Sequence, residues 1–289
     1  QLSVPAGESI SFTAGLNIPA DADEGVYQGY ILLAEGEQNY RIPFAVLYGY
    51  TGQVGIEYVT MDPLAFSPDG DGYMDYTNIY FSYYSQMETT DILLWSPDGP
   101  RATQGYVGYI GFIDSPIPPG QYRITGGWDG YYFPFDENGN LLPTPVKAED
   151  GFYTIDFYAY DDAAQEYSAW GDVFVDTVPP EVELSLEPGS HELPAGEEHI
   201  LSGTVIDTEL FRYRDAGYNV DQSLNQVFLV NLNTYDFIAL EVDGEGNFAH
   251  TFTLEAGETI NWLFSVEDFA GNYVDHYYDL TGLLQEEEP

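Results

Sequence analysis

The chain has 289 residues, of which 49 are Asp or Glu and only six are Lys or Arg, so its formal net charge at pH 7 is −43. This charge excludes nucleic acids and anionic membrane surfaces as partners, because both are bound through basic side chains. The absence of cysteine excludes disulfides, thiolate-bound zinc and thiol catalysis. No apolar stretch reaches the roughly 18 residues that a membrane span needs, so no membrane insertion is predicted.

The acidity has two compatible explanations. An exported protein from a saline, alkaline or hot habitat gains solubility from a high net charge, at a cost in stability through self-repulsion. Alternatively, several carboxylate clusters bind Ca²⁺, which relieves that repulsion. Apolar residues make up 44% of the chain, enough to build hydrophobic cores.

The predicted elements are almost all strands, because Tyr and Phe are abundant and helical periodicity is nearly absent. The first is Ser9–Leu16, followed by a hairpin of Val26–Ala34 and Asn39–Tyr48. Thr77–Tyr84 and Asp91–Ser96 are predicted to form a second pair. Further strands are predicted, in chain order, at Gly120–Gly126, Phe152–Tyr160, Ala169–Val175, His199–Asp207, Gln226–Leu232, Asp236–Val242, Asn247–Leu254, Thr259–Asp268 and Tyr273–Asp279.

Short strands separated by Gly and Pro turns along the whole chain predict an all-β protein of tandem antiparallel β-sandwiches. Pro179-Pro180 is typical of an interdomain joint. The expected organisation is a partial module at 1–50, a sandwich with long loops at 51–178, a second sandwich at 179–284 and an acidic tail at 285–289. A Pro/Glu-Ala-Gly-Glu turn before a strand occurs at Val4, Leu193 and Leu254, either as a shared turn solution or as a trace of duplication.

Several segments resemble known modules. Residues 4–49, with "GVYQGYILL" and "YRIPF", resemble the fibronectin type III-like region behind the catalytic domain of subtilisin-like cell-envelope proteases. "FSPDGDGYMD" at Phe66–Asp75 is similar to the opening of accessory sandwiches in exported bacterial proteins, and "SVEDFAGNYV" at Ser265–Val274 resembles the closing strands of bacterial Ig-like modules. The resemblance implies fibronectin type III-like and Ig-like folds in an extracellular, cell-surface protein.

Nothing in the sequence matches the catalytic part of such a protease. A Gly-flanked serine motif is absent, and the four histidines, His191, His199, His250 and His276, fall in or beside predicted strands. We therefore expect no enzymatic activity.

The first module holds about three strands, whereas a fibronectin-like sandwich has about seven. An open apolar edge is a template for strand addition by another chain. Either the chain begins at an arbitrary expression boundary, or it is a processed fragment completed by a neighbouring subunit. The leading hypothesis is a head-to-tail homopolymer that forms a surface filament. The alternative is a Ca²⁺-stiffened spacer that positions substrates for a cell-envelope protease.

Two loops are candidate Ca²⁺ sites because carboxylate and amide oxygens alternate around glycines. The first comprises Asp69, Asp71 and Asp75, and the second comprises Asp136, Asn138 and Asn140. Turn formation is the competing explanation for both. For Asp243–Asn247 a hairpin turn is the simpler explanation, and Asp268 and Asn272 are expected to form turn hydrogen bonds rather than to bind a metal.

Aromatic residues at Gly126–Phe135 have three candidate roles. Trp128, Tyr131 and Tyr132 could form part of a core, a subunit contact or a platform for a sugar ring. The last role would make the protein a carbohydrate-binding adhesin that contacts cell wall or glycan.

Overall fold

The computed structural model describes residues 15, 25–35, 38–48 and 54–284. The chain divides into two compact units, Gln1–Val54 and Gly55–Pro289. The predicted strand Ser9–Leu16 falls, apart from residue 15, outside the described residues, as do the turn at Val4 and the acidic tail at 285–289.

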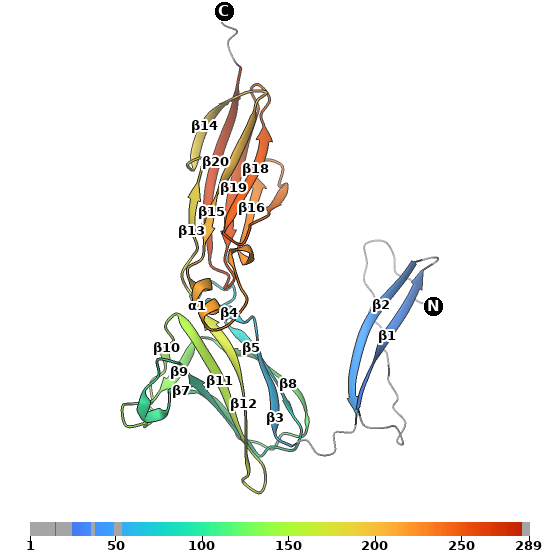
Figure 1. The fold of residues 1–289 in the computed structure, drawn as a ribbon, viewed down its shortest axis with the longest axis vertical. Helices are drawn as coiled ribbons and strands as arrows, with labels where there is room; N and C mark the ends of the chain where they lie inside the picture. The colour runs from blue at the N-terminus through green and yellow to red at the C-terminus, as the bar shows by residue number, and fades with distance from the viewer. Residues whose placement is uncertain (1–14, 16–24, 36–37, 49–53, 285–289) are drawn as a thin grey trace, which may run out of the picture. The chain divides into compact units, whose positions relative to one another are not determined.

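The described part of the first unit is one hairpin. Strands β1 (Gly25–Glu35) and β2 (Gln38–Tyr48) pair antiparallel along their full length, which confirms the predicted hairpin (Figure 1). Among the described residues, no other strand joins this two-stranded sheet.

The first part of the second unit is a sandwich of a three-stranded and a seven-stranded sheet. The three-stranded sheet has the order β3-β5-β8, formed by Ile56–Asp62, Thr77–Tyr83 and Gly120–Trp128. The seven-stranded sheet has the order β10-β9-β7-β6-β11-β12-β4, formed by Val146–Lys147, Tyr131–Pro134, Tyr106–Ile113, Thr89–Trp95, Gly151–Tyr160, Glu166–Val175 and Ala65–Phe66. A short 3-10 helix, Arg101–Thr103, precedes β7.

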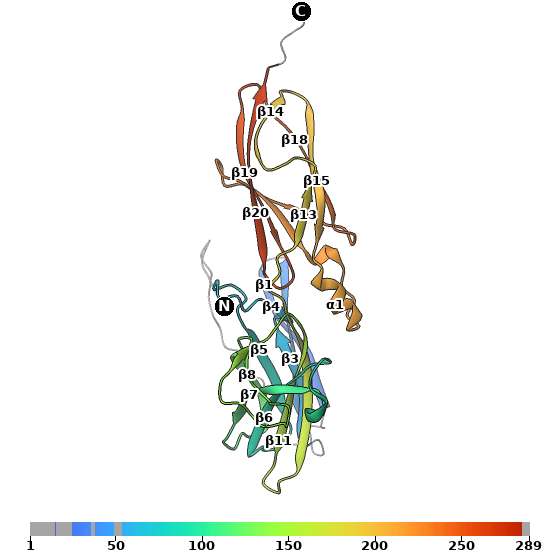
Figure 2. The same ribbon diagram turned by 90° about the vertical axis from the view of Figure 1, so that its left-hand side faces the viewer.

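The second part is another sandwich, whose two sheets are seen as two layers in Figure 2, with β19 and β20 on the left and β13 and β15 on the right. One sheet has the order β13-β15-β18, formed by Glu181–Leu184, Glu198–Ile206 and Asn247–Thr253. The other has the order β14-β20-β19-β16-β17, formed by Gly189–Pro194, Tyr273–Leu283, Thr259–Glu267, Gln226–Asn231 and Phe237–Leu240. Helix α1 (Glu209–Asp215) and a 3-10 turn (Gln222–Leu224) lie between β15 and β16.

The all-β class and the tandem sandwiches are therefore as predicted, but one predicted pairing is wrong. Thr77–Tyr84 and Asp91–Ser96 correspond to β5 and β6, which lie in different sheets of the sandwich. β5 pairs with β3 and β8, whereas β6 pairs with β11 and β7. The link between β5 and β6 crosses from one sheet to the other, because both sheets must contribute an apolar face to the same core.

The two described copies of the Ala-Gly-Glu turn have the same backbone conformation at their glycine. Gly196 and Gly257 have φ angles of +77° and +78°, a region that glycine enters without strain. Each lies two residues before a strand, β15 and β19 respectively. A shared turn conformation is therefore sufficient to explain these two copies.

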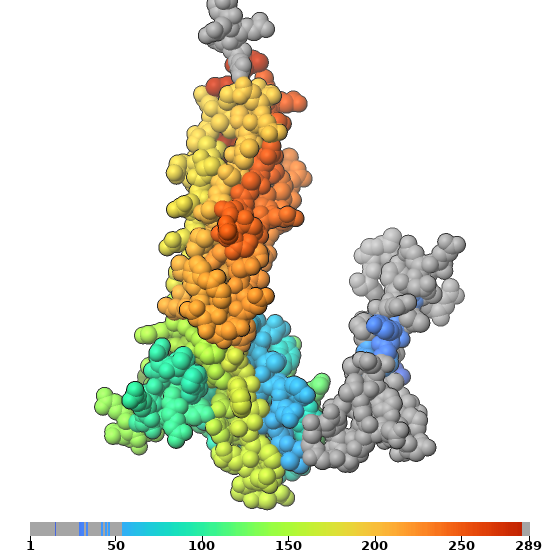
Figure 3. Space-filling view, in the orientation of Figure 1, coloured from blue at the N-terminus to red at the C-terminus, as the bar shows by residue number. Residues whose placement is uncertain are grey.

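Each sandwich has its own core, and a third core joins them. The first core contains Ile79, Phe81, Leu94, Ile155 and Phe157, and the second contains Leu201, Val227, Leu229, Phe264 and Leu280. The third core consists of Ala65 and Phe174 from the first sandwich with Leu210, Tyr213 and Ala270 from the second. We call this region the junction; Figure 3 shows the segment around α1, in light orange, lying directly on the end of the first sandwich.

Aromatic packing makes the junction a well-defined contact. The rings of Phe174 and Tyr213 have their centroids 3.9 Å apart, and Tyr218 meets Phe174 edge-on at 5.2 Å. The Arg212 guanidinium donates a hydrogen bond to the backbone carbonyl of Asp150, at 3.1 Å. Burial of large aromatic side chains stabilises such contacts by several kcal/mol in total, on the order of 1.5–3 kcal/mol for each fully buried large apolar side chain.

Candidate metal centres

Three aspartates at the junction follow directly after strands. Asp176 comes after β12 of the first sandwich, Asp207 after β15 and Asp268 after β19 of the second. β15 and β19 belong to opposite sheets of their sandwich. The ends of three strands from three different sheets therefore carry these side chains to one place.

We call Asp176, Asp207 and Asp268 the junction cluster. One carboxylate oxygen from each lies within 4.8 Å of those of the other two. The three residues are 0%, 1% and 2% exposed, respectively. Aspartates are almost never buried this completely unless a partner compensates their charge.

Hydrogen bonds fix the orientation of each carboxylate. Asp176 accepts from the backbone N–H of Val178 at 3.0 Å and from the Tyr213 hydroxyl at 3.3 Å. Asp268 accepts from the backbone N–H groups of Ala270 and Asn272, both at 2.9 Å. These bonds hold the carboxylates in place but add no positive charge.

Asp207 has an unused oxygen. Its Oδ1 accepts from the backbone N–H of Glu209 at 2.8 Å, while its buried Oδ2 has no hydrogen-bond partner among the described residues. The neighbouring basic residue, Arg212, is paired with Glu209 at 2.9 Å. A buried carboxylate oxygen without a donor costs about 1–3 kcal/mol or more, so this arrangement fits a site that could hold a cation.

The pKa values of the cluster are raised, chiefly by burial. Burial and the neighbouring charges of Asp268, Asp207 and Glu209 raise the pKa of Asp176 to about 8. Burial raises the pKa of Asp207 to about 6, and the negative charge of the nearby Asp268 contributes a smaller increase. Burial also raises the pKa of Asp268, against the effect of its hydrogen bonds. Without a cation, the cluster therefore binds protons at pH values where exposed aspartates are charged.

The donor set selects the metal. Three carboxylates supply only hard oxygen ligands, which suit Ca²⁺ or Mg²⁺ and not the nitrogen- and sulfur-binding metals. Ca²⁺ tolerates irregular geometry and accepts backbone carbonyls, whereas Mg²⁺ requires a near-ideal octahedron. Irregular chain at the ends of three strands therefore favours Ca²⁺.

The first predicted loop site is also assembled in the structure. Asp69, Asp71 and Asp75 bring carboxylate oxygens within 4.8 Å of one another, at the surface. Asp75 accepts from the backbone N–H groups of Gly70 at 2.6 Å and Gly72 at 2.8 Å. Calcium binding by this loop stays a prediction, because these bonds also explain the clustering as a turn.

This loop contacts the second sandwich. The Tyr73 hydroxyl donates a 2.7 Å hydrogen bond to Oε1 of Glu267, the residue before Asp268. Gly271 has a φ angle of +93°, which favours glycine, and a methyl group placed there would lie 2.7 Å from the Met74 sulfur. The exposed loop and the junction cluster thus meet at the same turn of the second sandwich.

The second predicted loop has the geometry of a turn. Asp136 Oδ1 accepts from the backbone N–H groups of Asn138 and Asn140, both at 2.8 Å. Its Oδ2 accepts from the Asn140 side chain at 2.9 Å. Asp243 and Asn247 form the same set of bonds, with distances of 2.8 and 2.9 Å. Metal binding by Asp136, Asn138 and Asn140 stays a prediction beside this sufficient structural role.

Asp268 and Asn272 form this same turn, as expected from the sequence. Asn272 also makes a contact with the first sandwich. The Asn272 side chain reaches across the junction to the backbone carbonyl of Asp176, at 3.0 Å. The junction cluster was not predicted from the sequence. A usable signal was present, since "VFVD", "TVID" and "SVED" each place an aspartate at the end of an apolar strand.

The aromatic residues at Gly126–Phe135 divide between core and surface. Trp128 is 1% exposed and belongs to the first core, where its indole N–H donates to the Tyr131 carbonyl at 2.9 Å. Tyr132 packs against the same core, whereas Tyr131 is exposed. Trp128 is thus a core residue and cannot form a platform for a sugar ring, whereas Tyr132 is partly buried against that core.

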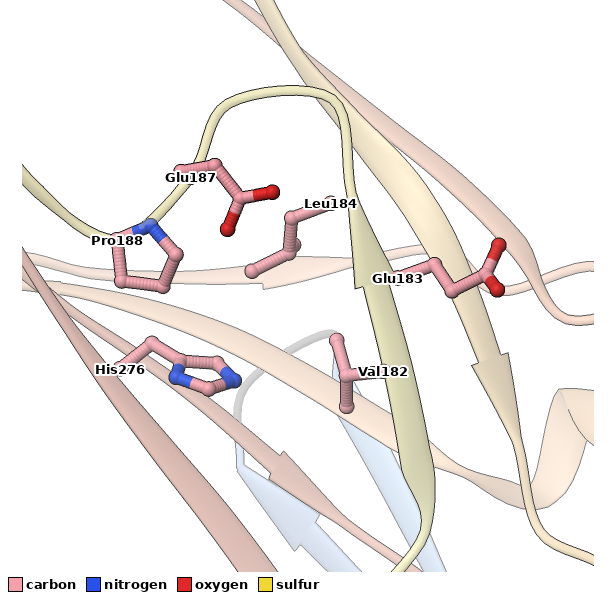
Figure 4. A pocket seen from close by; sticks show the side chains of 6 residues that line it. All are labelled: Val182, Glu183, Leu184, Glu187, Pro188 and His276. Carbon is pink, nitrogen blue, oxygen red and sulfur yellow. The ribbon is translucent and has the colours of Figure 1, made fainter.

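A cavity of about 410 Å³ in the second sandwich contains one of the four histidines. It opens where β13 and β14, consecutive in the chain, belong to different sheets. In Figure 4, Val182 and His276 point into this space, while the Glu183 carboxylate points away from it. His276 stacks on Phe264, which fits a structural role.

In the described part of the chain, no helix is long and apolar enough to cross a membrane.

Comparisons with known proteins give structural neighbours but no family. No protein-family model matches the chain, and no curated protein matches it. Fibronectin(III)-like modules of Clostridium thermocellum CbhA align with 80% of this chain and 98% of their own, at 14% identity and a TM-score of 0.38. The titin I-band fragment I67–I69 aligns with 80% of this chain and 64% of its own, at 15% identity and a TM-score of 0.37. A solved chain from a structural study of the host cell surface retention of a 1.5-MDa bacterial ice-binding adhesin aligns with 92% of this chain and 76% of its own, at 13% identity and a TM-score of 0.33.

Proposed function

We propose that the chain is an extracellular structural protein in which Ca²⁺, bound by the junction cluster, locks two sandwiches into one stiff element. The observation that carries this proposal is the convergence of Asp176 from one sandwich with Asp207 and Asp268 from the other. A cation bound there neutralises like charges that otherwise repel across the contact. It also converts a contact that could bend into a cross-link between two rigid bodies.

Such an element would hold a neighbouring domain at a fixed distance from a surface. The resemblance of residues 4–49 to the accessory region of cell-envelope proteases supports a spacer of this kind. Millimolar Ca²⁺ outside cells suffices for extracellular modules whose dissociation constants are about 10⁻⁴–10⁻³ M.

The test is the angle between the two sandwiches with and without Ca²⁺. Spin labels or fluorophores are attached to cysteines introduced at exposed positions of each sandwich, for example Thr144→Cys and Ser190→Cys. With Ca²⁺ the distance distribution is expected to be narrow, and chelation should broaden it. Equal widths under both conditions would count against the proposal.

A filament subunit is the second candidate, and the hairpin of β1 and β2 favours it. The two strands described in this unit would be only marginally stable alone in water, so the hairpin would gain from further strands. Ile42 on this hairpin is 41% exposed. Strands supplied by another copy would complete the module and link subunits head to tail.

Electron microscopy separates the two candidates. Negative staining of the purified chain should show long uniform fibres if subunits complete one another, and isolated rods if the chain is a spacer only. Fibres that persist in chelator would support strand exchange as the link, and fibres that dissolve would assign the link to Ca²⁺.

A further inference from the structure

The outer face of the seven-stranded sheet carries a row of aromatic side chains. Side chains alternate between the two faces of a strand, and Ile155 and Phe157 of β11 point into the first core. Their neighbours on β11 therefore face outward. The strand register aligns outward residues across five strands in the order Trp170, Asp156, Leu93, Tyr109 and Phe133.

A second outward row lies two residues along β12, β11 and β6, and three residues along β7, where the register shifts. It runs Ser168, Tyr158, Asp91 and Phe112. Trp170 is 64% exposed and Phe112 is 67% exposed, so both rings are open to solvent. We call this surface, formed by both rows together with Tyr106, the aromatic face.

Two carboxylates of this face fix the direction of two tyrosine hydroxyls. The Tyr106 hydroxyl donates to Asp156 Oδ2 at 2.5 Å and lies 2.7 Å from the Tyr158 hydroxyl. The Tyr109 hydroxyl donates to Asp91. Since these protons point at carboxylates, the tyrosine oxygens are left with lone pairs to accept further bonds.

Asp156, which accepts the hydrogen bond from Tyr106, is buried. It is only 9% exposed, and burial raises its pKa while hydrogen bonds from Tyr106 and Tyr158 act in the opposite direction. Its other oxygen, Oδ1, is buried without a hydrogen-bond partner among the described residues. This arrangement costs stability without improving packing, so it fits a surface that binds a ligand.

We infer that the aromatic face binds an extended neutral polysaccharide. Aromatic rings attract the partially positive C–H groups of a sugar ring through their negative faces. Hydroxyl groups of the polysaccharide would supply the donors that the tyrosine oxygens and carboxylates lack.

The spacing of the exposed rings sets the size of the ligand. Trp170 on β12 and Phe112 on β7 are separated by β11 and β6. Three strand spacings amount to about 14 Å, so both rings can be contacted only by a chain of several sugar units.

Other classes of ligand fit this face less well. A polyanion is repelled by a protein with a net charge of −43. An apolar protein surface would bury acceptor oxygens without donors, which costs free energy. A basic peptide would find Asp91 and Asp156 already covered by tyrosine hydroxyls.

The experiment is affinity electrophoresis of the full chain in native gels that contain soluble neutral polysaccharides: xylan, glucomannan, mixed-linkage glucan or dextran. Pull-down on insoluble cellulose and chitin extends the panel. We expect retardation or capture by at least one member, with a loss of about tenfold in affinity for Trp170→Ala and for Phe112→Ala. Trp170→Phe, which keeps a ring, should retain most of the binding.

Tyr277→Ala is the matched control, because Tyr277 is 59% exposed on β20 of the other sandwich. It should bind as the unmodified chain does. Absence of binding across the panel, or equal losses in Trp170→Ala and Tyr277→Ala, would overturn the inference. Self-association that Trp170→Ala abolishes, without polysaccharide binding, would also overturn it and assign the face to contacts between copies.

Discussion

The Asn272 side chain donates a hydrogen bond to the backbone carbonyl of Asp176, and this bond connects the two sandwiches beside three buried carboxylates. Asn272 also holds Asp268 in place through its backbone and side-chain N–H groups. One amide therefore links an aspartate of each sandwich. The junction is built around these acidic groups, so its stability should depend on whatever neutralises them.

Asp207→Asn should stabilise the protein in chelator and abolish its stabilisation by Ca²⁺. The change removes a buried charge whose Oδ2 lacks a partner, a gain of roughly 1–3 kcal/mol. It also removes one of three anionic ligands. Thermal unfolding in EDTA and in Ca²⁺ measures both effects. Asp215→Asn, at an exposed position at the end of α1, is the control and should change neither.

Without Ca²⁺, stability should fall as the pH rises from about 4 to 8. The pKa of Asp176 is raised from 3.8 to about 8 and that of Asp207 to about 6 on folding, so the folded state holds more protons than the unfolded state in this range. Ca²⁺ must displace those protons, so its stabilising effect should grow over the same range. Melting temperatures in EDTA and in Ca²⁺ at several pH values test this. A rise in stability with pH in EDTA would contradict it.

Tyr213→Ala should separate the unfolding of the two sandwiches. Tyr213 is 1% exposed and packs on Phe174 across the junction, so its truncation should cost roughly 3–5 kcal/mol of the contact. Differential scanning calorimetry should then show two transitions in place of one. Tyr213→Phe loses only the 3.3 Å hydrogen bond to Asp176 and should keep a single transition.

Asp136→Ala should behave like Asp243→Ala. Both aspartates hold the same turn through an asparagine four residues later, and these hydrogen bonds lower the pKa of each. Each substitution should lower the melting temperature by a similar amount in EDTA and in Ca²⁺. A Ca²⁺-dependent difference confined to Asp136→Ala would instead support the metal site predicted there.

Strands with clear alternation were predictable from the sequence. The hairpin of β1 and β2 and the long strand β11 follow from apolar residues at every second position between turn signals. β7 was not predicted, because Gly108 and Gly111 within it, and Gly105 just before it, give this stretch the composition of a loop. The pairing of β5 was wrong because neighbours in sequence were assumed to be neighbours in a sheet.

The junction cluster could not be predicted from local sequence patterns, for a different reason. Asp268 and Asn272 form the same turn as Asp136 and Asn140, with nearly identical distances. Only burial against the other sandwich distinguishes them, and burial depends on how the two sandwiches pack. A local pattern could therefore predict the turn but could not predict the cluster.

The most direct test of the account is calorimetric titration of chelator-treated protein with Ca²⁺, for the unmodified chain and for Asp207→Asn. The account predicts that the unmodified chain binds Ca²⁺ with release of protons, and that Asp207→Asn lacks this binding event while Asp71→Asn retains it. Identical stoichiometry and affinity in the unmodified chain and Asp207→Asn would contradict the assignment of Ca²⁺ to the junction.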